Sequence, residues 1–382
     1  MSEHEPVKDV FIVADNILSP IGRTTAENFG HLKEGISGVK IHHNPAISVT
    51  PFTASIFKDK EVLLADLTPS YTKFEQLLMA SIQDALKGCS IDLSSPETIC
   101  IICSTKGNIS LLETEQRTRE LNQRVALYTS AALVKDYFGL ADQPVVISNA
   151  CISGVLGIIT GMRLLQRGQY RNAIVTGADA VSKFVVSGFQ SFQALSLEVC
   201  RPFDKSRNGL NLGEGASTMV LSTQKQHTND IRVTGGATSN DANHISGPSR
   251  TGQELGFAIG QAMKAAGITS EEINFISTHG TATVYNDEME ANAIGIAGVA
   301  QVPLFSLKGN YGHTLGAAGV IETVAALHCL KENILLPSLG FTRLGVTQQI
   351  NVNTALTPAP LQHALKTASG FGGCNAALVL SK

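Results

Sequence analysis

The 382-residue sequence contains no tryptophan, few other aromatic residues and no excess of charge of either sign. Its 29 Lys and Arg against 32 Asp and Glu leave a net charge of −3, so it lacks the basic surface that a nucleic-acid partner would require. No apolar run approaches the roughly 18 residues of a membrane span. Residues 1–6 lack the basic and apolar segments of a secretory signal. Without a membrane span or a secretory signal, we expect the protein to be cytoplasmic. Because 43% of the residues are hydrophobic and only 16% are charged, we also expect it to be globular.

The seven cysteines are odd in number and scattered, which argues against a disulfide framework and favours a reducing compartment. Cys100 and Cys103 form a C-x-x-C pair, but they lie inside the apolar run 99–103. A second ligand pair is missing nearby, so the run is interpreted as a buried strand. No metal site is expected.

Strand-like and helix-like segments alternate along the chain, which is typical of an α/β protein. Two segments have the same plan of a strand, a short polar turn with one reactive residue, and a helix that begins with small residues. They are 145–166, with Cys151 in the turn, and 303–330, with His313. We therefore predict a duplicated fold that divides in the polar stretch 222–230, giving halves 1–224 and 225–382. Residues 38–70 are predicted to be an irregular excursion with short strands.

Three residues that can carry chemistry follow predicted strand ends. Cys151 lies where a helix N-terminus would favour a thiolate nucleophile, although a free cysteine is more commonly a small buried hydrophobe. His279 and His313 each follow a strand and have glycine neighbours. A lone histidine is more often structural, but the carboxyl ends of parallel strands converge on one crevice. We therefore expect the three side chains to meet.

Three segments that contain glycine are interpreted in two different ways. The turn 370–375 could direct backbone N–H groups at an oxyanion, or could be a tight hairpin, and the residues favour neither. The segments 201–209 and 213–215 do not match the spacing of a Walker or Rossmann phosphate loop and are interpreted as structural.

Taken together, these segments resemble the motifs of β-ketoacyl-acyl-carrier-protein synthases, in that family's order, from about residue 10 to 380. The nucleophile motif is Asn149–Gly154, and the first histidine motif is His279–Thr283 with Asn286–Glu288. The lysine, second histidine and glutamate motif is Lys308 with Gly312–Glu322. Further landmarks are Arg201–Asp204 and Gly370–Gly373. The resemblance implies a duplicated, five-layered αβαβα thiolase-like fold, usually built as a dimer.

The resemblance also implies roles for these residues. Cys151 would accept the acyl chain as a thioester, while His279 and His313 would hold the malonyl thioester and favour its decarboxylation. The backbone N–H groups of Cys151 and Phe371 would stabilise the oxyanion, and Phe371 would also gate the acyl and malonyl pockets. Lys308 and Glu322 would form a supporting ion pair. The implied substrate contacts are Thr281, Thr283, Gly370 and Gly372.

The implied enzyme is an acyltransferase, a 3-oxoacyl-[acyl-carrier-protein] synthase of fatty acid or polyene and polyketide-type biosynthesis. Its partners would be acyl carrier protein, with malonyl and acyl thioesters on the phosphopantetheine arm, and a second identical or related ketosynthase-like subunit. The resemblance implies no resident cofactor. There are three alternatives: a chain-length-setting partner subunit, which typically lacks the nucleophile; a biosynthetic thiolase, for which Cys374 could be the second cysteine; and a cysteine hydrolase, which would leave the second histidine and Lys308 unexplained.

The sequence departs from the family pattern at three places. Val284 replaces the usual proline after the Thr-x-Thr motif, Ser369 replaces a phenylalanine two residues before Phe371, and the segment 38–70 is short. These departures concern the acyl pocket and the carrier-protein surface rather than the chemistry, and a trimmed chain fits a specialised lipid pathway.

Overall fold

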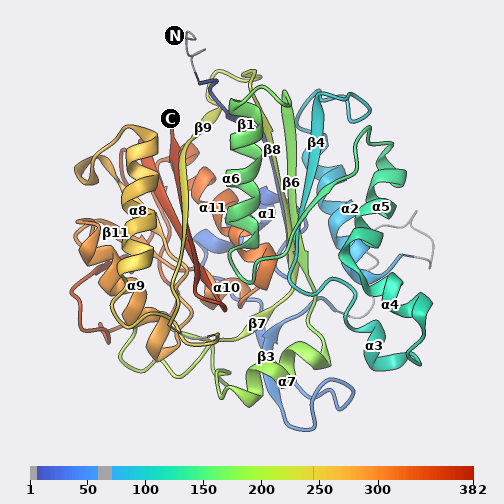
Figure 1. Ribbon diagram of the computed structural model, residues 1–382. Coiled ribbons are helices and arrows are strands. Elements are labelled where there is room, and N and C mark those ends of the chain that lie inside the picture. Colours follow the sequence, from blue (N-terminus) through green and yellow to red (C-terminus); the bar gives the residue numbers. More distant parts are fainter. Residues whose placement is uncertain (1–6, 59–70, 244) are drawn as a thin grey trace.

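The computed structural model describes residues 7–58, 71–243 and 245–382. The acidic start at 1–6 and the part of the predicted excursion at 59–70 lie outside these residues. The described chain forms a mixed α/β structure around one long sheet (Figure 1). Across the described ranges, every helix is too short or too polar to cross a bilayer.

The 11-stranded sheet consists of two half-sheets with the same topology. Strands of the first half lie in the order β1-β8-β6-β4-β5, and strands of the second in the order β9-β16-β15-β10-β11, with β13 (Asn351–Val352) at the edge. Numbered within each half, both orders are 1-5-4-2-3. The pairings match too, because the first two pairs in each order are antiparallel and the last two are parallel. The strands are β1 (Phe11–Leu18), β4 (Thr98–Cys103), β5 (Val145–Ile147), β6 (Asn172–Asp179), β8 (Gly215–Ser222), β9 (Ile231–Asn240), β10 (Phe275–Ser277), β11 (Pro303–Phe305), β15 (His363–Gly370) and β16 (Cys374–Ser381).

The half-sheets join through a short antiparallel contact, in which Phe11 pairs with Arg232 and Ile12 with Ile231. This repeat confirms the predicted duplicated α/β fold. The proposed division at 224 and 225 falls in the connection between Ser222 and Ile231. That each half is a domain in its own right stays a prediction.

Helices complete five layers (Figure 1). In the middle layer, α6 (Ser153–Gln166) and α11 (Ala318–Glu332) contact each other and strands of both halves. The outer helices α2 (Lys73–Leu86) and α5 (Leu127–Phe138) cover the first half-sheet. On the other side, α8 (Gln253–Ala266) and α9 (Val284–Ile296) cover the second.

The two middle helices pack so closely that glycine is needed at their contact. A Cβ added at Gly154 would lie 2.6 Å from the backbone nitrogen of Val320, and one added at Gly319 would lie 2.4 Å from that of Val155. Real Cβ atoms do not approach backbone atoms so closely. The small residues that open both predicted helices are thus explained by backbone-to-backbone packing.

Shorter elements connect these layers. The predicted short strands of the excursion are found as β2 (Val39–His42) and β3 (Phe52–Ser55), which form a small sheet with β7 (Leu212–Gly213). The remaining elements are α1 (Thr25–Lys33), α3 (Leu111–Thr114), α4 (Arg119–Val125), α7 (Lys183–Ser191), η1 (Ser270–Glu272), α10 (Lys308–Tyr311), η2 (Leu315–Ala317), β12 (Ile334–Leu335) and β14 (Thr357–Pro358).

The C-x-x-C pair lies in the buried strand β4, as the sequence predicted. Cys100 and Cys103 belong to different core clusters, on opposite sides of the sheet, so they do not face a common ligand. Burial raises the pKa of the Cys100 thiol to about 12. Both cysteines are core residues of the first half.

Candidate active site

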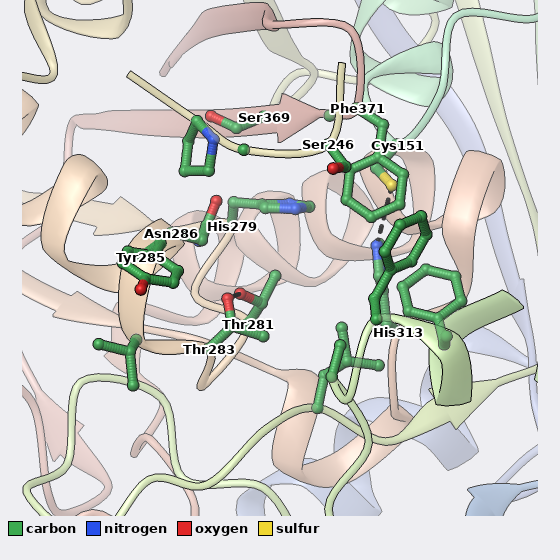
Figure 2. A pocket seen from close by; sticks show the side chains of 18 of the residues that line it. Cys151, Ser246, His279, Thr281, Thr283, Tyr285, Asn286, His313, Ser369 and Phe371 are labelled. Carbon is green, nitrogen blue, oxygen red and sulfur yellow. Dashed lines mark hydrogen bonds between the residues drawn. The ribbon is translucent and has the colours of Figure 1, made fainter. Parts of the chain in front are cut away.

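The predicted cysteine and the two predicted histidines meet at one point beside the middle layer. Cys151 precedes α6, His279 follows β10, and His313 lies between α10 and η2. The His313 Nε2 atom lies 3.0 Å from the Cys151 Sγ atom, and the two imidazole centroids are 5.2 Å apart at 83°. All three residues are buried. Figure 2 shows His279 directed toward the Cys151–His313 pair. The expected convergence is therefore present, whereas the catalytic roles remain proposals.

Cys151 lies in a tight turn between β5 and α6 that hydrogen bonds hold in a strained conformation. Ala150 adopts a positive φ of 44°, which is uncommon for a residue with a side chain. The Ser153 hydroxyl accepts from the Asn149 N–H at 2.8 Å and donates to the Ala150 carbonyl at 2.6 Å. Together these contacts close the turn between β5 and α6 and present the sulfur to the cavity.

The expected thiolate at Cys151 is not supported. Burial raises the pKa of this thiol from 9.0 to about 12, although the charge of Lys308 opposes that rise. A helix N-terminus contributes about 2 kcal/mol at most, which would lower the pKa by only about 1.5. Desolvation therefore outweighs the helix, and the resting residue is a neutral thiol beside an imidazole.

Both histidines rest in the neutral form. Burial is the largest cause, and the charge of Lys308 the next largest, that holds the pKa of His279 and of His313 well below the usual 6.5. A neutral imidazole has one N–H donor and one acceptor nitrogen. Two such rings side by side can donate to a developing oxyanion and accept a proton from the thiol.

A buried ion cluster lies behind the histidines. As predicted, the Lys308 ammonium contacts Glu322, and it also donates to the His279 carbonyl at 2.9 Å. The sequence analysis missed Lys366 on β15, whose ammonium lies 2.6 Å from the second carboxylate oxygen of Glu322. A lysine inside an otherwise buried strand was the available signal.

Two further acidic residues, to which the sequence analysis gave no role, fix the His279 turn. Glu290 on α9 accepts the N–H groups of His279 at 2.8 Å and Gly280 at 2.7 Å. Asp287 accepts those of Thr281 at 3.0 Å and Ala282 at 3.1 Å. Burial raises the pKa of Asp287 to about 7. Asp287 lies within the quoted family motif, but its contacts depend on tertiary packing.

The three residues open onto a cavity of about 480 Å³. Its wall includes Thr281 and Thr283, whose hydroxyl oxygens are 2.9 Å apart, as well as Gly370. An added Cβ at Gly370 would lie 2.9 Å from the Cys151 backbone nitrogen, so the glycine turn lies directly against the nucleophile turn. These positions agree with the predicted substrate contacts.

Phe371 also lines the cavity and is partly exposed, among aromatic rings that the sequence analysis did not identify. Its ring centroid lies 5.8 Å from that of Phe189 and 5.4 Å from that of Phe192, both contributed by α7 or its end. A partly exposed ring at the mouth is compatible with the predicted gate. Helix α7 has Phe, Val and Phe residues that could equally have been core, so the sequence carried no clear signal.

The predicted position of Gly372 needs correction, because this residue is not part of the cavity wall. It adopts φ of 87° in the hairpin turn, and its N–H donates to the Ile245 carbonyl at 2.6 Å. The turn geometry directs Gly372 toward the loop that carries Ile245, so it supports the wall from behind. The segment 370–375 therefore serves as both a hairpin turn and part of the site.

Two of the three departures from the family pattern, Val284 and Ser369, lie at this cavity. Val284 and Tyr285 are exposed at the start of α9 and line the cavity. Ser369 donates to the Asn375 side-chain oxygen at 2.8 Å, and both residues are in the wall. A small hydroxyl therefore occupies the place where the family usually has an aromatic ring.

The thiolase alternative is not favoured by the position of Cys374. Its sulfur donates to the Phe371 carbonyl at 3.3 Å, and burial raises its pKa to about 11. The residue is not part of the cavity wall. Its sulfur also contacts the Asn149 carbonyl at 3.8 Å, so it lies between the glycine turn and the nucleophile turn.

Within the described ranges, Cys151, His279 and His313 are also the group with the geometry of metal ligands, since their ligand atoms all lie within 4.8 Å of one another. The ammonium groups of Lys308 and Lys366 lie behind these histidines and would repel a divalent cation. The absence of a resident metal stays a prediction.

Comparison with known proteins adds independent findings. Residues 7–227 match the family model described as the N-terminal domain of beta-ketoacyl synthase, and residues 231–342 match its C-terminal domain. The chain is 28% identical to 3-oxoacyl-[acyl-carrier-protein] synthase 2 of Vibrio cholerae over 98% of this chain and 99% of the relative.

Solved structures also match over nearly the whole chain. The ishigamide ketosynthase/chain length factor structure aligns with a TM-score of 0.88 at 24% identity, covering 98% of this chain and 99% of that one. A beta-ketoacyl synthase from Burkholderia phymatum aligns with a TM-score of 0.88 at 22% identity, with the same coverage. At these identities the structures establish the fold, and they agree with the predicted thiolase-like architecture.

Proposed function

The chain belongs to the β-ketoacyl synthase family, and from this premise we propose that it is a decarboxylating 3-oxoacyl-[acyl-carrier-protein] synthase. Membership establishes the class, a condensing enzyme of the acyltransferase type. The finer activity is supported by one observation above all, the 3.0 Å contact between the Cys151 sulfur and His313 beside a second neutral imidazole.

In the first proposed step, Cys151 takes the acyl group from its carrier thioester. The thiol proton passes to the leaving thiolate by way of His313 as the sulfur attacks, because a thiol with a pKa of about 12 is not ionised beforehand. The tetrahedral oxyanion accepts from the N–H groups of Cys151 and Phe371. The product is acyl-Cys151 and a free carrier thiol.

In the second step, His279 and His313, the latter now with its proton on the Nε2 atom, donate hydrogen bonds to the thioester carbonyl of malonyl-carrier protein. Carbon dioxide leaves, and its bonding electrons form an enolate whose oxygen those donors stabilise. The enolate carbon then attacks acyl-Cys151, the carbon–sulfur bond breaks to release the 3-oxoacyl product, and the thiolate takes up a proton from solvent. This step needs hydrogen-bond donors that already point at the oxygen. Both imidazole rings are buried, which restricts their movement.

We also propose the partners. Relatives named for acyl-carrier-protein substrates support carrier-bound thioesters whose phosphopantetheine arm passes Thr281 and Thr283. The ketosynthase/chain length factor neighbour supports pairing with a related subunit, with self-association as the other option. An intact Cys151 assigns this chain the catalytic place in either dimer. All seven cysteines are free, which supports a reducing, cytoplasmic setting, and the proposed chemistry needs no resident cofactor.

Replacing Cys151 by glutamine tests the proposal. The variant removes the nucleophile but leaves both imidazoles, so condensation should fall below detection while carbon dioxide release from malonyl-carrier protein continues. The measurement is radiolabelled carbon dioxide release alongside mass spectrometry of the condensation product. Surviving condensation would reject Cys151 as the nucleophile. An absence of carbon dioxide release from both the variant and the unaltered protein would favour a thiolase, which does not decarboxylate.

A His313→Ala variant provides the complement. It should reduce carbon dioxide release about 10²- to 10³-fold, the usual loss when one oxyanion donor is removed. An unchanged yield of carbon dioxide would count against the role of His313.

A further inference from the structure

Lys366 makes an unusually complete set of contacts for a buried lysine. Its side chain is fully buried in β15, and its ammonium donates to Glu322 at 2.6 Å, the Thr278 carbonyl at 3.1 Å and the Ser277 carbonyl at 3.3 Å. A protonated amine has three N–H donors, and three oxygen atoms accept them here. The contacts therefore match the charged form, as burial of a lysine requires.

Two of these contacts are made with the backbone of the segment that carries His279. Lys366 holds the carbonyls of Ser277 and Thr278, and Lys308 holds that of His279 itself. Both lysines bind the same carboxylate, Glu322 on α11. Because α11 follows directly from the His313 turn, this carboxylate links the two histidine-bearing segments.

The neighbouring residue on β15 acts on the other side of the same turn. The Thr367 hydroxyl donates to Glu290 at 2.6 Å, and Glu290 accepts the N–H groups of His279 and Gly280. Successive residues of a strand point to opposite faces, so Lys366 and Thr367 brace the His279 turn from two sides.

Lys366 also balances the buried charge. Three buried carboxylates lie near His279: Asp287, which Arg207 approaches at 3.9 Å, and Glu322 and Glu290, which the ammonium groups of Lys308 and Lys366 oppose. Without Lys366 a net negative charge would remain behind the imidazoles. Such a charge would stabilise a protonated imidazole and would repel an enolate in a site of low dielectric.

We propose that Lys366 is a positioning residue for the decarboxylation half-reaction, which fixes His279 opposite His313 and cancels the second buried carboxylate. This inference rests on the proposed function. Acyl transfer to Cys151 forms no enolate and depends on His313, so it should be much less sensitive to Lys366 than carbon dioxide release.

The test compares Lys366→Met and Lys366→Gln with a matched control, Lys73→Met. Lys73 also pairs with a buried carboxylate, Glu214, but in the first half and away from the cavity wall. We expect both Lys366 variants to lose 10- to 100-fold in carbon dioxide release from malonyl-carrier protein. The rate of Cys151 acylation, measured by mass spectrometry of the acyl-protein, should fall less than threefold. The control should retain both half-reactions.

A second readout separates a charge effect from loosened packing. The charges of Lys308 and Lys366 act on both imidazoles, and the Cys151 sulfur contacts His313. The buried carboxylates around them are Glu322, which binds both lysines, and Glu290 and Asp287, which bind backbone N–H groups of the His279 turn. Loss of one positive charge should raise the pKa of both imidazoles, so the acidic limb of the carbon dioxide release profile should move to higher pH. A structural role alone would lower the rate without moving that limb. The glutamine variant, which retains an N–H donor, provides this profile if the methionine variant fails to fold.

The outcomes distinguish this inference from the proposed function. Absence of both half-reactions in the unaltered protein would reject the proposed function. An active unaltered protein whose Lys366 variants release carbon dioxide normally, or lose both half-reactions equally with an unmoved acidic limb, would overturn the role of Lys366.

Discussion

The first and second halves of the molecule share one strand order but hold the loops near the reactive residues through different backbone groups. In the first half, the Asp179 carboxylate at the end of β6 accepts the N–H groups of Thr105 and Lys106, and it also reaches that of Gly316 beside the His313 turn. In the second half, Lys308 and Lys366 gather carbonyl groups of residues 277–279. The duplicated scaffold brings the strand ends together, and each buried ion decides which backbone groups are held there.

Two of the reactive residues occupy equivalent positions in the two halves. Cys151 and His313 each come after the third strand of their half and precede a middle helix. One copy of the fold thus supplies the sulfur and the other supplies the imidazole. The close contact between α6 and α11 brings the two turns within hydrogen-bond distance.

The largest effect on stability is expected from Asp179→Ala. The change would leave the buried Gly316 N–H and Ser104 hydroxyl without their carboxylate, each at a cost of about 1–3 kcal/mol, and also the partly buried N–H groups of Thr105 and Lys106. We expect a loss of at least ~3 kcal/mol in the free energy of unfolding, measured by urea denaturation. Asp179→Asn, which keeps one acceptor oxygen, should lose less. Equal losses in the two variants would show that the carboxylate is not what holds these loops.

An intermediate effect is expected where the halves touch. Gly154→Ala and Gly319→Ala would each drive a Cβ against the opposing backbone, and overpacking of this kind costs about 1–3 kcal/mol. Both should also reduce condensation, because Cys151 and His313 lie at the starts of these helices. The control is Gly260→Ala in α8, where an added Cβ meets nothing within 4 Å and alanine should stabilise the helix slightly. Matching stabilities for all three variants would contradict the close contact.

The smallest effect concerns Asp15, which joins the first strand of one half to the middle helix of the other. Burial alone would raise its pKa, but the hydrogen bond and charge of His328, with the charge of Lys331, lower it from 3.8 to about 2. A lowered pKa stabilises the fold above pH ~4 by roughly 2 kcal/mol, and that contribution is lost as the pH falls toward 2.

The difference in unfolding free energy between the unaltered protein and Asp15→Asn should therefore be largest near neutral pH and shrink below pH ~4. Denaturation at several pH values measures it. The exposed pair of Asp9 with Arg232 provides a control, since surface ion pairs contribute little. A difference that stays constant down to pH ~2 would contradict the lowered pKa.

Local pattern was sufficient for the duplicated α/β fold and for the meeting of Cys151, His279 and His313. The roles of these residues came from the resemblance to a family. The helix N-terminus favours a thiolate at Cys151, whereas burial raises the pKa of its thiol to about 12, and desolvation of this kind is not visible in the sequence. The resemblance also implied a substrate contact at Gly372, but this residue adopts a positive φ and its N–H donates to the Ile245 carbonyl.

The groups that support the site were the hardest to predict. Lys366 is nearly 90 residues from the carbonyls that it binds, and Glu290 holds its partners from the face of a neighbouring helix. Neither has a spacing that marks a role. Phe189 and Phe192 could have been core residues of an amphipathic helix and became part of the cavity wall only through the placement of α7.

By itself the sequence determined the periodicity of strands and helices, the repeated plan of the halves and the three reactive residues, because these are properties of residue order and side-chain chemistry. Only the tertiary structure decided the charge of the sulfur and the imidazoles, and which distant ions hold them. Those properties depend on desolvation and on contacts between residues far apart in the chain, which exist only once the two halves have packed together.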